Sequence, residues 1–472
     1  MKKFLLVLVG LLMYSCDQAD PVTYFGGEIV NPKDDYVYLF YEEVQLDSAS
    51  LDDQNRFHFS LNNPEEGVYK FFHGREYQYI LLEAQDSLML RLNTMEFDES
   101  LIFSGIGSEK NNFMIDMFLL KEDEKNLVDN FYKASPEIFV KKLDSMRAMK
   151  VVEYEELLSE TDLSPLAKHV TKATIDFPYY TNKEYYTDMH KYWLGLKEKP
   201  ELPESFYNHR MQVDINDKSL AHLEAYSNYV NAYLDRLTKD NCRGACQIGG
   251  KWSPYHYGTH KLHLVDSLIS LGNLRSKLFE TTAFKYFQYD HQEETNKKFI
   301  TLYKKLTSGN SSADIDMVYQ AVNNLRKGAT FPVLELYDKK GEKHRLDSSW
   351  YDQKTVFYTW HSDRKMLARE KIQHMTEMAS KYPEFQFIGI NLDPDHQTWL
   401  NTMNELGVSD KNQLRAPDME YIVKRFAYLR LNRMVVVDKD GKVIEGFGNI
   451  YNFAPIEYNK VASKLTESLP EL

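Results

Sequence analysis

Hydrophobic and polar residues alternate in short runs between residues 24 and 103. Such runs recur about every ten residues, separated by Asn, Asp and Pro clusters that favour turns, and this pattern is typical of antiparallel β-sandwiches. We therefore predict an antiparallel β-sandwich domain over residues 23–107. Its clearest strands are Tyr36–Tyr41, Phe57–Leu61, Val68–Phe72, Tyr79–Glu83 and Leu88–Leu92.

From residue 108 to residue 326 the pattern changes to a helical period, with long stretches rich in Lys, Glu, Leu, Ala and Met. We predict a central α-helical domain here, with about six to nine helices. Pro136 and Pro165 stand near two predicted helix starts, where a missing N–H costs little. The best candidates are Asn112–Asp129, Pro136–Glu160, Leu163–Asp176, Asn216–Leu237 and Glu293–Leu306.

The last part of the chain, residues 327–472, alternates apolar runs with helical patterns, which predicts an α/β domain. The sequence Asp438-Lys-Asp-Gly441 is a strong hairpin turn signal. The predicted strands are Val356–Trp360, Phe385–Leu392, Met434–Val437 and Lys442–Phe447, and the predicted helices are Leu367–Tyr382, His396–Leu406 and Glu457–Ser468.

Length and composition favour a folded protein, since 472 residues with 43% hydrophobic residues suffice for two or three cores. The formal net charge is −13, which argues against nucleic acid as a partner and against broad adhesion to anionic membranes. The 33 Tyr and 26 Phe residues suit either aromatic-rich cores or a binding surface.

The N-terminus has the features of a secretory signal. Lys2 and Lys3 precede the apolar run Phe4–Met13, which is too short to span a bilayer permanently. A small residue then precedes Cys16, and this arrangement resembles a bacterial lipobox. The resemblance implies that residues 1–16 comprise a lipoprotein signal peptide and its lipidated cysteine, followed by a tether over residues 17–22. An ordinary secretory signal with an incidental cysteine is the alternative.

The remaining cysteines, Cys242 and Cys246, are separated by three residues. In an oxidising envelope, an even pair so close together favours a disulfide, which would fix local shape. A zinc site is the alternative, because His256 and His260 would complete a set of four ligands. A redox-active pair is a third reading, although catalytic pairs normally have two intervening residues and lie at a helix N-terminus.

The predicted strand that ends at Trp360 and the helix after it resemble the active-site segment of one enzyme family. In the TlpA/ResA-like, or thiol-disulfide-reductase-like, branch of the thioredoxin superfamily, this strand runs into Trp-Ala-Ser/Thr-Trp-Cys-x-x-Cys-Arg-x-Glu. Trp360 and Glu370 match the two ends, whereas Arg364 and Leu367 occupy the cysteine positions. The resemblance implies a C-terminal α/β thioredoxin-like fold in a Bacteroidota lipoprotein that lacks the active-site cysteines.

A second position departs from the same family pattern. The family has a cis-proline six residues before the Asp of its hairpin turn, and counting back from Asp438 gives Asn432. A cis bond before a residue other than proline is costly, so we expect a trans peptide there. His361, Ser362 and Asp363 are adjacent, so their side chains do not converge as a catalytic triad requires, and we expect Ser362 or Asp363 to cap the next helix.

Neither Arg364 nor Leu367 supplies the thiolate that thiol-disulfide exchange requires. The lipobox-like N-terminus predicts a lipid-anchored protein of the cell envelope, in the outer membrane and facing the periplasm or the cell surface. We expect a non-catalytic binding or scaffold role without a cofactor, for an envelope protein or small-molecule ligand of unknown identity. A thiol-disulfide oxidoreductase that uses Cys242 and Cys246 is the first alternative. A surface lipoprotein that binds glycans or peptides is the second.

Overall fold

The computed structural model describes residues 22–453 except 75, 243–245, 249–250, 310–311, 394, 410 and 428–431. The predicted signal peptide, Cys16, nearly all of the tether and the helix predicted over residues 457–468 lie outside the described residues. The chain forms two compact units, one made of residues 1–237 and 268–275, the other of residues 238–267 and 276–472. This division falls inside the predicted helical segment. Among the described residues, no helix combines the length and apolar character that crossing a bilayer requires.

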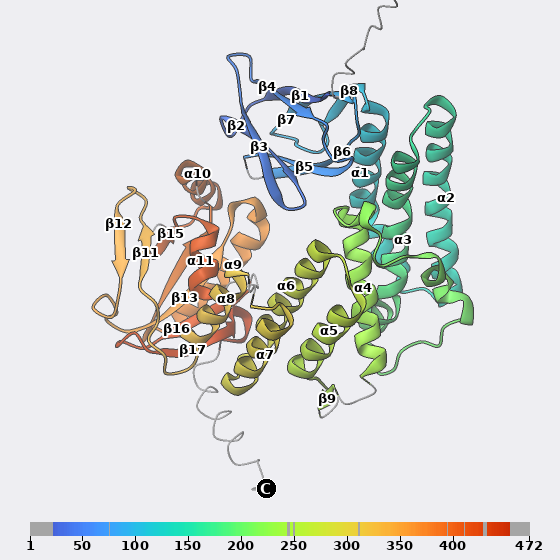
Figure 1. Ribbon diagram of the computed structural model, residues 1–472. Helices are drawn as coiled ribbons and strands as arrows, with labels where there is room; N and C mark the ends of the chain where they lie inside the picture. The colour runs from blue at the N-terminus through green and yellow to red at the C-terminus, as the bar shows by residue number, and fades with distance from the viewer. Residues whose placement is uncertain are drawn as a thin grey trace, which may run out of the picture. The chain divides into compact units, whose positions relative to one another are not determined.

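The first unit begins with two four-stranded sheets, drawn in blue in Figure 1, in the orders β4-β1-β7-β8 and β3-β2-β5-β6. Both sheets contribute buried side chains to one core, in which Phe25 contacts Phe59 from its own sheet and Phe71 from the other. The strands are β1 (Val22–Val30), β2 (Tyr36–Tyr41), β3 (Val44–Ser50), β4 (Arg56–Asn62), β5 (Gly67–His73), β6 (Glu76–Leu82), β7 (Ser87–Asn93) and β8 (Ile102–Ile106).

All five strands predicted in this region are confirmed, each within a few residues. The turn residues Asn31, Asn63 and Gln85 have positive φ angles, as their positions between strands require. The prediction of a purely antiparallel sandwich is wrong in one pairing, because β1 runs parallel to β7. The excursion through β2–β6 between these two strands provides the long connection that a parallel pair needs.

The helices of the first unit follow directly: α1 (Ser108–Phe131), α2 (Pro136–Glu160), α3 (Pro165–Leu194) and most of α4 (Glu224–Asn241), with short 3-10 segments over Glu204–Gln212 and Lys218–Leu220. Pro136 and Pro165 begin α2 and α3, as predicted. Two predicted bounds are wrong. Helix α3 continues through Pro178, because buried side chains on both sides of the proline hold the two halves in place. Helix α4 begins eight residues after the predicted start Asn216, because Asp217 instead caps a 3-10 turn.

The second unit contains a short hairpin and four helices, shown in green to yellow in Figure 1. These elements are β9 (Gln247–Ile248), β10 (Lys251–Trp252), α5 (Pro254–Leu268), α6 (Gly272–Tyr289), α7 (Glu293–Leu306) and α8 (Ala313–Asn324). The described residues between 108 and 326 thus contain eight α-helices, which agrees with the predicted number.

A seven-stranded sheet forms the rest of the second unit, in the order β12-β11-β15-β14-β13-β16-β17. Strand β13 pairs in parallel with β14 and antiparallel with β16, which forms a hairpin with β17. Helix α9 connects β13 to β14, and this arrangement is that of a thioredoxin-like fold. The elements are β11 (Leu334–Tyr337), β12 (Lys343–Leu346), β13 (Lys354–Trp360), α9 (Lys365–Lys381), β14 (Phe385–Asn391), α10 (His396–Leu406), β15 (Gln413–Arg415), α11 (Met419–Phe426), β16 (Arg433–Val437) and β17 (Val443–Asn449).

Candidate functional site

Trp360, the last residue of β13, is a core residue. Its side chain is 1% exposed and packs with Trp399 and Met434 among others in the cluster below α9. The indole N–H donates to Oε1 of Gln413 at 3.0 Å, and Nε2 of Gln413 donates to the Tyr358 hydroxyl at 2.9 Å. This chain of buried hydrogen bonds fixes the end of β13, so the turn that follows starts from a rigid position.

A buried aspartate that we did not predict holds this turn. Oδ2 of Asp393 accepts the backbone N–H of Ser362 at 3.0 Å and the side-chain amide of Asn391 at 2.8 Å, while Oδ1 lies 3.2 Å from Nδ1 of His361. The side chain of Asp393 is almost fully buried. Its sequence signal was available, because Asp393 lies two residues after the end of the apolar strand β14, and parallel neighbours β13 and β14 end at the same sheet edge.

Ser362 does not cap α9, so that part of the capping prediction is wrong. The helix begins without a side-chain cap, and the side chain of Asp363 is outside the described set. Oγ of Ser362 is buried and has no hydrogen-bond partner among the described residues. The backbone N–H of Ser362 instead donates to Oδ2 of Asp393.

The two family cysteine positions lie on an open groove between the start of α9 and α10, with a cavity volume of about 650 Å³. Arg364 and Leu367 both line it, beside Met366, which is 77% exposed. An ion pair between Nζ of Lys365 and Glu405, at 2.6 Å, links the two walls. The groove is therefore a surface of apolar and charged side chains, suited to contact with a ligand but without a nucleophilic sulfur.

Lys371, one turn after Leu367 on α9, is buried and donates from Nζ to the carbonyl of Thr359 at 2.8 Å. Burial, and secondarily the positive charge of Arg364, lowers the pKa of the Lys371 ammonium to about 8. A lysine with so low a pKa would suit proton transfer, but its place in the core keeps it from a solute in the groove. Lys371 therefore helps to hold the end of β13 in place.

The other two residues of the predicted degenerate site, Glu370 and Asn432, are both exposed. Glu370 is exposed on α9, and its carboxylate interacts with the hydroxyl of Tyr451 and raises the pKa of that phenol, after the larger effect of burial. Asn432 is exposed at the start of the final hairpin. The peptide bond before it begins at Leu431, which is outside the described residues, so the predicted trans bond stays a prediction.

Cys242 and Cys246 are both buried and form the predicted disulfide, with their Cα atoms 5.7 Å apart. The bond closes the chain between the end of α4 and strand β9. Because both sulfur atoms are consumed, the alternative zinc set with His256 and His260 lacks the two thiolates it requires. Both sulfur atoms are therefore held in the bond between the end of α4 and β9.

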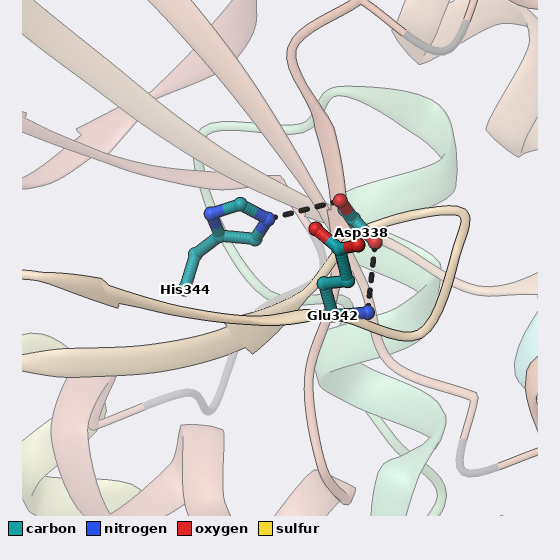
Figure 2. Close-up of side chains that lie close together, drawn as sticks. All are labelled: Asp338, Glu342 and His344. Atoms are coloured by element: carbon teal, nitrogen blue, oxygen red, sulfur yellow. Dashed lines mark hydrogen bonds and ion pairs between the residues drawn. The ribbon is translucent and has the colours of Figure 1, made fainter.

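Asp338, Glu342 and His344 lie close together at the turn between β11 and β12, as Figure 2 shows. Oδ1 of Asp338 accepts the N–H groups of Lys340 and Glu342, while Oδ2 lies 3.0 Å from Nε2 of His344, which holds the pKa of the carboxyl below its usual range. Asp438 accepts two backbone N–H groups in the same way in the hairpin of β16 and β17. The hydrogen bonds that close this turn thus account for the position of the Asp338 carboxylate.

Comparisons with known proteins give similarities for part of the chain. No protein-family model and no curated protein matches it. A thioredoxin domain of a thiol-disulfide oxidoreductase from Bacteroides vulgatus is similar at 18% identity, over 30% of this chain and 98% of that one, with a TM-score of 0.24. A thiol-disulfide oxidoreductase from Bacteroides fragilis is similar at 22% identity, over 30% and 99% of the two chains, with a TM-score of 0.22. A thiol:disulfide interchange protein from a Bacteroides species is similar at 17% identity, over 31% and 93%, with a TM-score of 0.23. The described residues between 327 and 453 have the strand order of a thioredoxin-like sheet.

Proposed function

We propose that this chain is a lipid-anchored protein of the cell envelope whose thioredoxin-like part binds a partner and carries out no thiol chemistry. The observation that carries the proposal is the groove at the start of α9, where Arg364 and Leu367 replace both sulfur atoms. Asp393 holds the turn before the groove, and Lys371 holds the end of β13, so the groove lies on a fixed backbone. Such a frame with an exposed, non-nucleophilic surface suits recognition.

The competing function is thiol-disulfide exchange through Cys242 and Cys246. Efficient exchange needs an accessible thiolate of lowered pKa, usually at a helix N-terminus. Cys242 follows the C-terminal end of α4, where the helix dipole disfavours a thiolate, and Cys246 is 1% exposed. Both features favour a structural disulfide over a catalytic one.

We expect the mature protein to show no reduction of insulin disulfides above the buffer rate in the presence of dithiothreitol. The double variant Arg364→Cys/Leu367→Cys is expected to gain measurable turnover, because it places two thiols at the N-terminus of α9, where the helix dipole stabilises a thiolate. The measurement is the rate of insulin precipitation at equal protein concentration.

The matched control is Thr301→Cys/Lys304→Cys, which creates the same spacing on the exposed face of α7 and is expected to stay at the buffer rate. Turnover by the unaltered protein that disappears in Cys242→Ser or Cys246→Ser would refute the proposal. A double variant no faster than the α7 control would instead contradict the functional equivalence of this helix start with a thioredoxin site.

The lipid anchor is tested separately. In cells fed an alkyne fatty acid, the full-length protein is expected to carry the label and to sediment with membranes, because a diacylated cysteine buries enough hydrocarbon for stable anchoring. Cys16→Ser is expected to lose both properties, while Cys242→Ser keeps them. Labelling that survives Cys16→Ser would exclude this residue as the anchor.

A further inference from the structure

The sheet β4-β1-β7-β8 has an outer face that points away from the sandwich core. Side chains alternate along its strands, so every second residue belongs to the buried core and the residues between them point outward. Four outward side chains on these strands are large, apolar and exposed. They are Tyr24 at 40%, Met89 at 41%, Ile102 at 60% and Ile106 at 65%.

Three of these side chains gather at the end of the sheet where β1 begins. Tyr24 of β1 and Ile106 of β8 both pair with Ser87 of β7. Met89 lies two residues further along β7, so it is the diagonal neighbour of both on the same face. Diagonal neighbours on adjacent strands are about 7–8 Å apart, within reach of long side chains. We call Tyr24, Met89 and Ile106 the apolar patch.

The outer face carries little negative charge, although the whole chain has a formal net charge of −13. Glu28 is the one carboxylic acid among the outward residues of these four strands, all of which are described, and its Oε1 lies 4.0 Å from Nε of Arg91. The turn between β4 and β5, at the same end of the sandwich, instead carries Glu65 and Glu66, both exposed. Charged groups are costly to dehydrate, so the apolar patch is better suited than this turn to contact lipid.

The chain reaches this end of the sheet directly from the proposed lipid anchor. Five residues separate Cys16 from Val22, the first residue of β1. An extended chain covers at most about 3.6 Å per residue, so β1 begins within about 22 Å of the acylated cysteine. Tyr24 and Ile106 lie at this end of the sheet, and the tether therefore keeps both within reach of the bilayer surface.

We propose that the apolar patch lies against the lipid surface to which the chain is anchored. This inference rests on the proposed lipid anchor and adds the side of the molecule that contacts the bilayer. A tyrosine suits the membrane boundary because its ring is apolar while its hydroxyl stays hydrated, and the Met89 and Ile106 side chains enter the headgroup region. The anchor supplies a high local concentration of lipid, so the patch needs only weak affinity of its own. The first unit then has one preferred orientation on the membrane.

The test uses the acylated protein in phosphatidylcholine vesicles, with one fluorophore on each molecule. Met89→Cys and Ile106→Cys are each labelled with the thiol-reactive fluorophore NBD. The native cysteines do not react, because Cys16 carries the lipid and Cys242 is bonded to Cys246. Lipids with a doxyl group near the headgroup are expected to quench both labels by about half or more, because apolar groups at a membrane surface enter the headgroup–acyl boundary.

The matched control is Val44→Cys, on β3 of the other sheet, where the native side chain is 60% exposed. Its label is expected to keep its fluorescence. Equal quenching at all three positions, or at none, would overturn this inference alone, provided that the same samples sediment with the vesicles. A chain that does not sediment overturns the anchor and this inference together. Labels at residues 89 and 106 that become shielded with rising concentration of the Cys16→Ser protein, without vesicles, would show that a second copy covers the patch and would also overturn the assignment.

Discussion

Glu184→Gln is expected to lower the free energy of unfolding by about 3–5 kcal/mol, the usual cost of breaking a buried ion pair by removing one partner. The carboxylate of Glu184, on α3, is fully buried and accepts two hydrogen bonds from Arg210, with Nε at 2.8 Å. Nε2 of His209 lies 3.1 Å from the same carboxylate. A neutral amide leaves the guanidinium, stacked on Tyr207, without its counter-charge. Urea denaturation followed by circular dichroism measures the loss.

The matched control is Glu294→Gln on α7, which breaks an exposed pair with Lys298 four residues along the same helix. Its effect is expected to stay within about 0.5 kcal/mol, as for other surface pairs. If the Glu184 variant were no less stable than this control, the buried pair would have no net role in holding α3 against the segment that carries Arg210.

The same cluster predicts acid sensitivity. Burial alone would raise the pKa of Glu184, but hydrogen bonds from Arg210 and His209 outweigh it and hold that pKa below its ordinary value. Burial lowers the pKa of His209, so the unfolded chain binds its proton more readily. Stability should therefore fall as the pH drops below about 6.5 through His209 and further below about 4.5 through Glu184. The Glu184 variant should lose the second of these two phases.

The second large effect is expected at the end of β13. Trp360→Ala should cost about 3–5 kcal/mol, since it removes a fully buried indole from the core of the thioredoxin-like part. Trp360→Phe keeps most of the volume but leaves Oε1 of Gln413 without its donor, so a loss of about 1–3 kcal/mol is expected. Chemical denaturation measures both variants.

Trp193→Ala is the control for a tryptophan side chain that is 41% exposed, and its cost should be about 1 kcal/mol. A double-mutant cycle between Trp360→Phe and Gln413→Leu isolates the hydrogen bond. Zero coupling energy in that cycle would mean that the bond contributes nothing, and that packing alone holds Trp360.

The sequence predicted regular elements best where one face is buried. Tyr36–Tyr41, Pro136–Glu160, Glu293–Leu306 and His396–Leu406 have the predicted bounds, because apolar period and flanking turn or capping residues agree there. Strand β3 shows no such pattern, since nearly all of its residues are exposed and it is held by pairing with β2. Its existence depends on a neighbour in space.

The resemblance predicted which segment would form the candidate site, but not how that segment is held in place. The resemblance located Arg364 and Leu367 correctly at the start of a helix after β13. Asp393 and Gln413 were not predicted, because their roles arise only when β14 pairs with β13 and β15 pairs with β14. Tertiary proximity of this kind leaves no short-range signal.

The position of β1 has a mechanical consequence. The strand begins at Val22, and it is flanked over most of its length by β4 on one side and β7 on the other. Tension on the chain ahead of Val22 acts along the strand, so it loads the hydrogen bonds to both neighbours together in shear. Strands pulled in this direction do not unzip one bond at a time. A pull from that end of the chain would therefore have to break hydrogen bonds to β4 and β7 together.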